Sequence, residues 1–349
     1  MKKAFTSSLE TISRLIPLSL YPRIVRRDCI DFFYHAVSDD PMPHVRHLYP
    51  VVPVADFEAA LLYLKANYTF VEYAQIHAHV FEGAPLPSRA VHLSFDDGYV
   101  ECYSVVRPLL LKHEIPCTYF LTTGLIDNHT LFYRNKQSLC VERIKDASFK
   151  RQAASFSNLL PSFHSPLSTH DDLIRWIKDL RLSDEALIDE VCRAVGVDGQ
   201  AFLQENLPYL TQDQIRQMQA EGFTIGAHTI THRKLMDLSA EEIETEIAQS
   251  CRTVVEITGQ QIVPFSFPHS AWGLDRGQLA VIRNRHPEIG LLFDTKGLHR
   301  DVDFIVNRVW AERSLTSERK LSSIPEVLRN AYQEDWVEEM LVLGRKLKK

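Results

Sequence analysis

The sequence predicts an α/β fold in which parallel strands close, or nearly close, into a barrel. Seven short runs of β-branched, aliphatic or aromatic residues are typical of buried strands, and helical patterns separate most of them. Alternation of strands and helices predicts a parallel sheet. Seven strands in one series favour a barrel over an open sheet.

The predicted strands are, in chain order, Cys29–Tyr34, Ala90–Phe95, Pro116–Leu121, Phe223–His228, Val263–Phe267, Ile289–Asp294 and Ile305–Val309. Apolar residues three and four positions apart predict helices at Asp56–Ala66, Val100–Lys112, Thr211–Glu221, Ala240–Ile257 and Asp275–Arg285. Ser239 and Glu242 form a capping-box pattern at the start of the fourth helix, and Gly259 marks its end.

The alternation is interrupted once, between the third and fourth strands. Helical patterns occur there at Gln137–Ile144, Asp171–Leu180 and Asp184–Val195, around a polar stretch at 155–168. We therefore expect a helical insertion at about 130–210 within a barrel domain of residues 28–323. Residues 324–349 are expected to form a helix on the outside of the barrel.

Residues 1–27 carry apolar residues at near-helical spacing, followed by Arg23, Arg26 and Arg27. Two interpretations stay open for this N-terminal helix. It packs on the body of the protein as an amphipathic helix, or it rests on anionic lipid as a basic interfacial helix.

Composition excludes several classes of protein. The chain has 349 residues, of which 45% are hydrophobic, and this apolar content argues against disorder. Its formal net charge of −6 argues against a basic nucleic-acid-binding domain. Its six cysteines form no close pairs, so neither a disulfide scaffold nor a structural zinc finger is expected. Glu10, Arg14 and Pro17 interrupt any signal-peptide pattern, and no apolar stretch reaches 18 residues. We expect a protein of the reducing cytoplasm.

The strongest local signal is Ser94-Phe95-Asp96-Asp97-Gly98-Tyr99, where an apolar strand ends in two carboxylates. A turn at Gly98 would allow both carboxylates to face one mouth, where one holds a metal while the other takes a proton. The alternative is an Asp-Gly turn that caps the following helix.

A second signal is the pair His228 and His232, four residues apart after another apolar run. This spacing suits two nitrogen ligands of one divalent ion, although surface or capping histidines would give the same pattern. Barrel active sites lie at the carboxyl ends of the strands. Those ends carry His35, Asp96, Asp97, His228, His269, Asp294 and Arg308. One carboxylate and two histidines would leave an open position for water, which favours hydrolysis.

These motifs resemble the polysaccharide deacetylases of carbohydrate esterase family 4. The likeness rests on SFDDGY, HTITH and FSFPHS in this order and covers roughly Asp28 to Trp310, apart from the insertion. FYHAV at the first strand is similar to the branch that acts on cell-surface and exopolysaccharide sugars. The resemblance implies a distorted (β/α)7 TIM-like barrel and a metal-dependent hydrolase that removes N-acetyl groups from an amino sugar.

The resemblance also implies roles for individual residues. Asp96 would be the general base, while Asp97, His228 and His232 would bind a divalent metal, foremost Zn²⁺. The backbone N–H of His269, after the proline of the third motif, would stabilise the oxyanion.

The sequence departs from the family in two places. Ser266 stands where an arginine usually braces the base, so Arg308, as in the exopolysaccharide branch, is expected to supply that charge; a surface salt bridge is its alternative. A Leu-x-x-His motif for the general acid is also missing. His35 and His299 are the candidates for that acid, with a buried structural role open for His35.

The sequence therefore predicts a metal-dependent N-deacetylase of the cytoplasm that takes an N-acetylated carbohydrate and no nucleic acid. Peripheral contact of its N-terminal helix with the inner face of the membrane stays open. Tyr99 and Trp272 could form sugar-stacking walls, or pack in the core. Two alternatives remain. The barrel could hydrolyse a non-sugar amide bond, or the protein could be a catalytically silent carbohydrate-binding protein.

Overall fold

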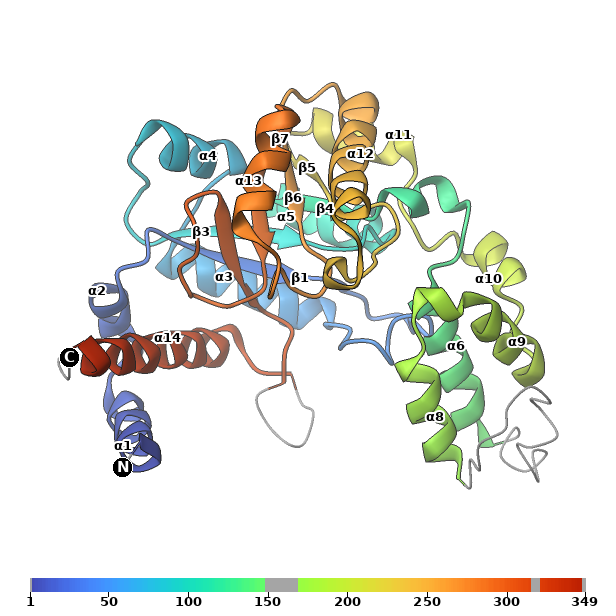
Figure 1. Cartoon of the computed structure of the whole chain (residues 1–349), viewed down its shortest axis with the longest axis horizontal. Coiled ribbons are helices and arrows are strands. Elements are labelled where there is room, and N and C mark those ends of the chain that lie inside the picture. The colour runs from blue at the N-terminus through green and yellow to red at the C-terminus, as the bar shows by residue number, and fades with distance from the viewer. Residues whose placement is uncertain (1, 148–168, 315–320, 347–349) are drawn as a thin grey trace.

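A closed barrel of seven parallel strands forms the body of the protein, as the sequence predicts (Figure 1). The computed structural model describes residues 2–147, 169–314 and 321–346. Neighbouring strands run in the order β1-β8-β7-β6-β5-β4-β3, and pairing of β1 with β3 closes the ring. The strands are β1 (Cys29–Tyr34), β3 (Ala90–Phe95), β4 (Thr118–Leu121), β5 (Thr224–Ala227), β6 (Val263–Ser266), β7 (Ile289–Asp294) and β8 (Ile305–Trp310). A two-residue strand, β2 (Thr69–Phe70), pairs with β3 outside the ring.

Helices surround the barrel because each strand is followed by a crossover to the next parallel strand. They are α3 (Val54–Asn67), α4 (Tyr73–Glu82), α5 (Arg107–His113), α11 (Gln212–Ala220), α12 (Ala240–Thr258) and α13 (Arg276–Arg285). The capping box of α12 is present, with the Ser239 hydroxyl accepting from the N–H of Glu242 and Gly259 ending the helix at a φ of 72°. Two of these differ from the sequence prediction. The pattern had not indicated α4, and the predicted helix at 100–112 begins with one π-turn, Cys102–Val106.

The region expected to be an insertion lies to one side of the barrel (Figure 1). Its described helices are α6 (Tyr133–Lys145), α8 (His170–Asp179), α9 (Glu185–Val195) and α10 (Gly199–Asn206). These helices form a hydrophobic cluster of their own, which reaches the barrel through Ala36, Tyr99 and Tyr209. The polar stretch at 155–168 lies outside the described residues.

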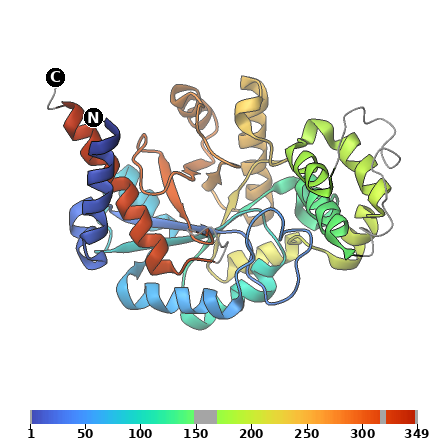
Figure 2. The ribbon, with the colours of Figure 1, turned by 90° about the horizontal axis from the view of Figure 1, so that it is seen from below.

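The two ends of the chain meet on the opposite side of the barrel. Helices α1 (Lys2–Leu15) and α2 (Tyr21–Val25), joined by the 3-10 turn η1 (Leu18–Leu20), pack against α14 (Ile324–Lys346). Tyr21 stacks on Tyr332 at 5.4 Å, and Arg27 pairs with Asp335. Figure 2 shows α1 and α14 side by side, with both termini at the same end of the helix pair. No helix among the described residues has the length and apolar character of a membrane span.

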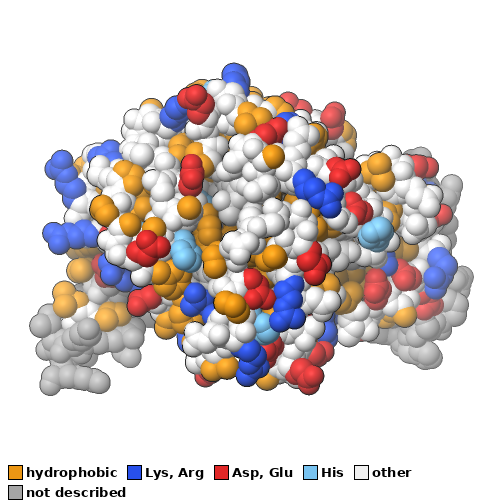
Figure 3. Space-filling model, turned by 90° about the horizontal axis from the view of Figure 1, so that it is seen from above, with side chains coloured by type: hydrophobic (Ala, Val, Ile, Leu, Met, Phe, Trp, Pro, Cys, Tyr) orange, Lys and Arg blue, Asp and Glu red, His pale blue; other side chains and the backbone are white. Residues whose placement is uncertain are grey.

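The interior of the barrel is both aromatic and charged. Alternate strand residues face inward, so Phe33, Phe120 and Phe293 surround the guanidinium of Arg308 at 4.5, 5.0 and 5.9 Å. The outer strand faces join the main core beneath the helices. On the surface shown in Figure 3, acidic and basic side chains are interspersed.

Candidate active site

The acid pair Asp96 and Asp97 lies at the carboxyl edge of the barrel, where β3 ends. Asp96 continues the inward-facing series of His92 and Ser94, since alternate strand residues share a face. Asp97 would point away from the barrel in a continuing strand. Instead, Asp97 and Gly98 adopt left-handed φ angles of 75° and 84°, which turn the chain. Both carboxylates are therefore buried at one mouth, as predicted.

The two histidines lie in the loop that follows β5. Thr229 and His232 have left-handed φ angles of 66° and 56°, so the loop curls tightly enough to bring His228 and His232 together. Glu246 of α12 holds this loop by accepting two of its backbone N–H groups at 2.7 and 3.1 Å. The ring centroids of His228 and His232 are 4.8 Å apart.

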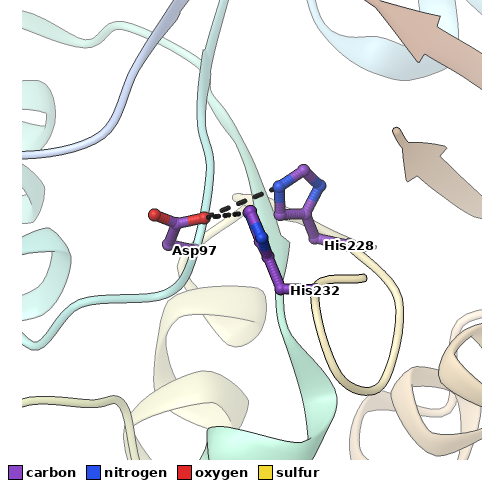
Figure 4. A group of neighbouring side chains, drawn as sticks. All are labelled: Asp97, His228 and His232. Carbon is purple, nitrogen blue, oxygen red and sulfur yellow. Dashed lines mark ion pairs between the residues drawn. The ribbon is translucent and has the colours of Figure 1, made fainter. Parts of the chain in front are cut away.

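Asp97, His228 and His232 converge on one point (Figure 4). The Oδ1 atom of Asp97 lies 3.2 Å from Nε2 of His232 and 3.5 Å from Nε2 of His228. Ligand atoms bound to one tetrahedral ion at about 2.0–2.2 Å are about 3.3–3.6 Å apart. The spacing of these three residues therefore suits a divalent ion.

The protonation states at this point also suit a metal. Nδ1 of His228 lies 2.8 Å from the carbonyl oxygen of Ser266, which leaves the Nε2 lone pair facing Asp97. Burial lowers the pKa of His228 to about 4 and so keeps the ring neutral. Burial opposes ionisation of Asp97, but the neighbouring histidines, His232 foremost, hold its pKa well below the usual range. Its buried Oδ1 accepts no hydrogen bond. An anionic carboxylate beside a neutral imidazole is the form that binds metal.

Arg308 braces Asp96 from inside the barrel. Nη1 lies 2.7 Å from Oδ1 of Asp96, and Nη2 lies 2.8 Å from Oδ2. The same two nitrogens donate to the hydroxyls of Ser94 at 3.0 Å and Ser266 at 2.6 Å. Burial raises the pKa of Asp96, but the charge and hydrogen bonds of Arg308, together with the charges of His228 and His35, outweigh burial and lower the pKa overall. Because Arg308 is fully buried, the alternative of a surface salt bridge is wrong.

His35 follows the last residue of β1 and lines the same cavity as the acid pair. Its Nδ1 forms an ion pair with buried Glu312, whose second oxygen accepts the backbone N–H of His35 at 3.0 Å. Burial favours the neutral ring, but the carboxylates of Glu312, Asp97 and Asp96, Glu312 foremost, together outweigh burial and raise the pKa of His35 to about 9. The ring stacks on Tyr49 at 4.0 Å. His35 is thus positioned as a cationic side chain at the mouth.

Two residues that sequence reasoning missed complete this corner of the site. The hydroxyl of Tyr49 donates to Oδ2 of Asp97, and Glu312 holds His35. Glu312 comes two residues after β8, so its place at a strand end was an available signal. Tyr49 lies in the long connection between β1 and α3, where the sequence has no periodic pattern to mark it.

The remaining candidates occupy different places. The loop that carries His269 is held by Asp294, which accepts the N–H of Ala271 at 2.9 Å. His269 has a φ of 61°, and its ring lies 5.3 Å from that of His232. His299 pairs with Glu338 of α14 at 2.6 Å.

The two aromatic residues that were candidates for sugar stacking lie in different environments. Tyr99 is fully buried, and its hydroxyl accepts from the side chain of Asn135 at 3.0 Å, so it forms core and no sugar-stacking wall. Trp272 is 73% exposed at the rim of the cavity. The cavity has a volume of about 1320 Å³ and extends from Asp96 and Asp97 to the end of α14.

The parallel barrel, with an acid pair and two histidines at its mouth, is compatible with a metal-dependent hydrolase. The family model for polysaccharide deacetylase matches residues 83–281, more than half of the chain. The chain therefore belongs to the polysaccharide deacetylase family, whose members are carbohydrate N-deacetylases. The match includes Asp96, Asp97 and both histidines, and leaves His35 and Arg308 outside.

Solved structures share the fold over most of the chain. IcaB from Ammonifex degensii is 17% identical with a TM-score of 0.53, covering 87% of this chain and 97% of its own. The deacetylase PplD from Streptococcus pyogenes is 16% identical with a TM-score of 0.51, covering 87% and 97%. A de-N-acetylase from Aggregatibacter actinomycetemcomitans is 15% identical with a TM-score of 0.51, covering 86% and 99%. No curated protein matches the sequence.

Proposed function

We propose that this protein is a metal-dependent N-deacetylase acting on an amino sugar of a cell-surface polysaccharide or its precursor. The observation that carries the proposal is the convergence of Asp97, His228 and His232 within 4.8 Å, beside the Arg308-braced Asp96. Family membership supports the substrate class. Zn²⁺ is the proposed ion, and other first-row divalent ions suit the same ligands.

Each side chain of the site has a proposed task. Asp97, His228 and His232 would hold the ion, which supplies Lewis-acid chemistry that acidifies water and polarises an amide carbonyl. Asp96, kept ionised by Arg308, accepts the proton of the attacking water as general base. The N–H of His269 donates to the oxygen of the acetyl group as negative charge develops there.

Breaking the C–N bond also requires a proton for the departing sugar amine. We propose His35 as the donor, because Glu312 keeps it cationic at neutral pH and it faces the same cavity as Asp96. The products are acetate and a free amino sugar. His299 is the weaker candidate, since its ring nitrogen pairs with Glu338 on α14.

We also propose a cytoplasmic location, against the inner face of the membrane. All six cysteines are free thiols, five of them buried, as suits a reducing compartment.

The test combines metal content with acetate release. Purified wild type should contain near-stoichiometric zinc or a similar ion, and His228→Ala and His232→Ala should both lose it. The exposed His129→Ala variant is the matched control and should retain the ion. Asp96→Asn should keep the metal but lose acetate release from N-acetylglucosamine oligomers.

The outcomes separate the alternatives. Metal-free wild type that fails to bind added zinc would contradict the hydrolytic mechanism. Glycan binding without acetate release, unaffected by Asp96→Asn, would indicate a silent carbohydrate-binding protein. Release of acetate only from non-sugar amides would place the same chemistry on another substrate.

A further inference from the structure

Exposed aliphatic side chains concentrate where the two ends of the chain meet. Ile12, Leu15, Leu20 and Ile24, on α1, η1 and α2, are 49%, 79%, 42% and 41% exposed. We call these four side chains the docking surface. Fourteen large hydrophobic side chains are exposed among the described residues, and four of them fall within these thirteen positions. The other side of the same segment is buried against α14, so one face is used for packing while another remains uncovered.

Basic residues flank the docking surface. Arg14, Arg23 and Arg26 are exposed beside it, and residues 1–27 contain six Lys and Arg but only one acid, Glu10.

We propose that the docking surface binds the surface of a membrane containing anionic lipid. Aliphatic side chains flanked by arginine match a bilayer interface, where the former enter the acyl boundary and the latter meet phosphate headgroups. A second copy of this chain fits less well, because a symmetric contact would bring the same arginines face to face.

The position of the cavity gives this docking a consequence for the substrate, which rests on the function proposed above. The catalytic cavity is lined at one end by Asp97 and at the other by Arg27, Val342 and Leu343. Arg27 follows α2 and pairs with Glu339, one turn before Val342 on α14. A docked molecule would therefore open its cavity next to the membrane. The substrate class that this arrangement fits is an N-acetylated glycan tethered to lipid.

Co-sedimentation of the full chain with vesicles tests the docking surface. Vesicles of equal phosphatidylglycerol and phosphatidylcholine should bind the protein, and vesicles of phosphatidylcholine alone should bind it at least tenfold less. Raising NaCl from 0.1 to 0.5 M should weaken binding, because salt screens headgroup attraction. Arg14→Gln/Arg23→Gln should weaken it roughly thirtyfold, as expected for two basic residues at an anionic surface.

Two further variants separate the apolar contribution from a general effect of mutation. Leu15→Ser/Leu20→Ser should weaken vesicle binding by about tenfold or more. Leu207→Ser, at a side chain that is 54% exposed beyond α10, is the matched control and should bind as wild type. Equal binding to both vesicle types, or unchanged binding of the leucine and arginine variants, would overturn the proposal. So would concentration-dependent dimerisation that is lost in the leucine variant.

Acetate release keeps this inference distinct from the proposed function. The docking variants lie outside the site, so they should release acetate from soluble N-acetylglucosamine oligomers at the wild-type rate. They should lose rate only on an N-acetylglucosamine conjugate anchored in anionic vesicles. Wild-type protein that releases acetate but does not bind anionic vesicles would refute only the proposal that the docking surface binds a membrane. Wild type that binds vesicles but releases no acetate would refute the deacetylase proposal alone.

Discussion

Replacing Arg308 by methionine should destabilise the protein strongly. The side chain is fully buried, and its two terminal nitrogens satisfy both oxygens of Asp96 at 2.7 and 2.8 Å. Methionine keeps much of the volume but leaves the Asp96 carboxylate buried without its counter-charge. Breaking a buried ion pair from one side costs about 3–5 kcal/mol. We therefore expect Arg308→Met to lower the free energy of unfolding by about that amount.

A double-mutant cycle separates this charge effect from lost packing. Asp96→Asn should also destabilise the protein, because it leaves the Arg308 cation buried without a carboxylate. The double variant contains neither buried charge, so its cost should fall well below the sum of the two single costs. Urea unfolding at pH 7 of the four proteins measures these differences. A cost below about 1 kcal/mol for Arg308→Met, or additive costs in the cycle, would refute the reasoning.

Two further predictions concern stability. The folded pKa of His35, about 9, lies above its ordinary value of 6.5. Its charged form, paired foremost with Glu312, therefore contributes about 3 kcal/mol of stability below pH 6.5, and this contribution is lost as pH rises through 9. Urea unfolding at pH 6 and 9.5 should show this loss in wild type and less of it in Glu312→Gln, and equal losses would contradict the assignment. Gly98→Ala should lower the free energy of unfolding by at least about 1 kcal/mol, because φ at this position is 84° and a Cβ would lie 3.0 Å from the Leu121 side chain. A variant that unfolds in urea like wild type would contradict this prediction.

The sequence predicts the barrel well because each strand is buried on both faces. Such strands appear as continuous apolar runs, and three predicted strands, Cys29–Tyr34, Ala90–Phe95 and Ile289–Asp294, match the structure at both ends. The sequence pattern missed a helix where few of its residues are buried. Helix α4 carries histidines and polar residues among few buried ones, Tyr73 and Ile76, so its periodicity is weak.

The metal-binding half of the candidate site was also open to prediction, and the proton-transferring half was only partly so. Asp97, His228 and His232 belong to two short motifs, each at the end of one strand. Tyr49 reaches the mouth through a long connection, and Glu312 reaches it after the last strand. Both are far in sequence from the residues that they contact, so no local pattern predicts these contacts. His35 could be proposed from its place after β1, but its charge could not, because that charge depends on Glu312, 277 residues away.

The contacts of Arg308 show how the closed barrel supplies a positive charge to Asp96. Ser266 has a small side chain, and its hydroxyl accepts from Nη2 of Arg308 at 2.6 Å. Ser94 on β3 accepts from Nη1 at 3.0 Å, so hydroxyls from two other strands fix the guanidinium that enters from β8. The two nitrogens of Arg308 thereby stay aligned with the two oxygens of Asp96 at 2.7 and 2.8 Å. Closure of the ring makes this arrangement possible, because residues from any strand can reach the same axis.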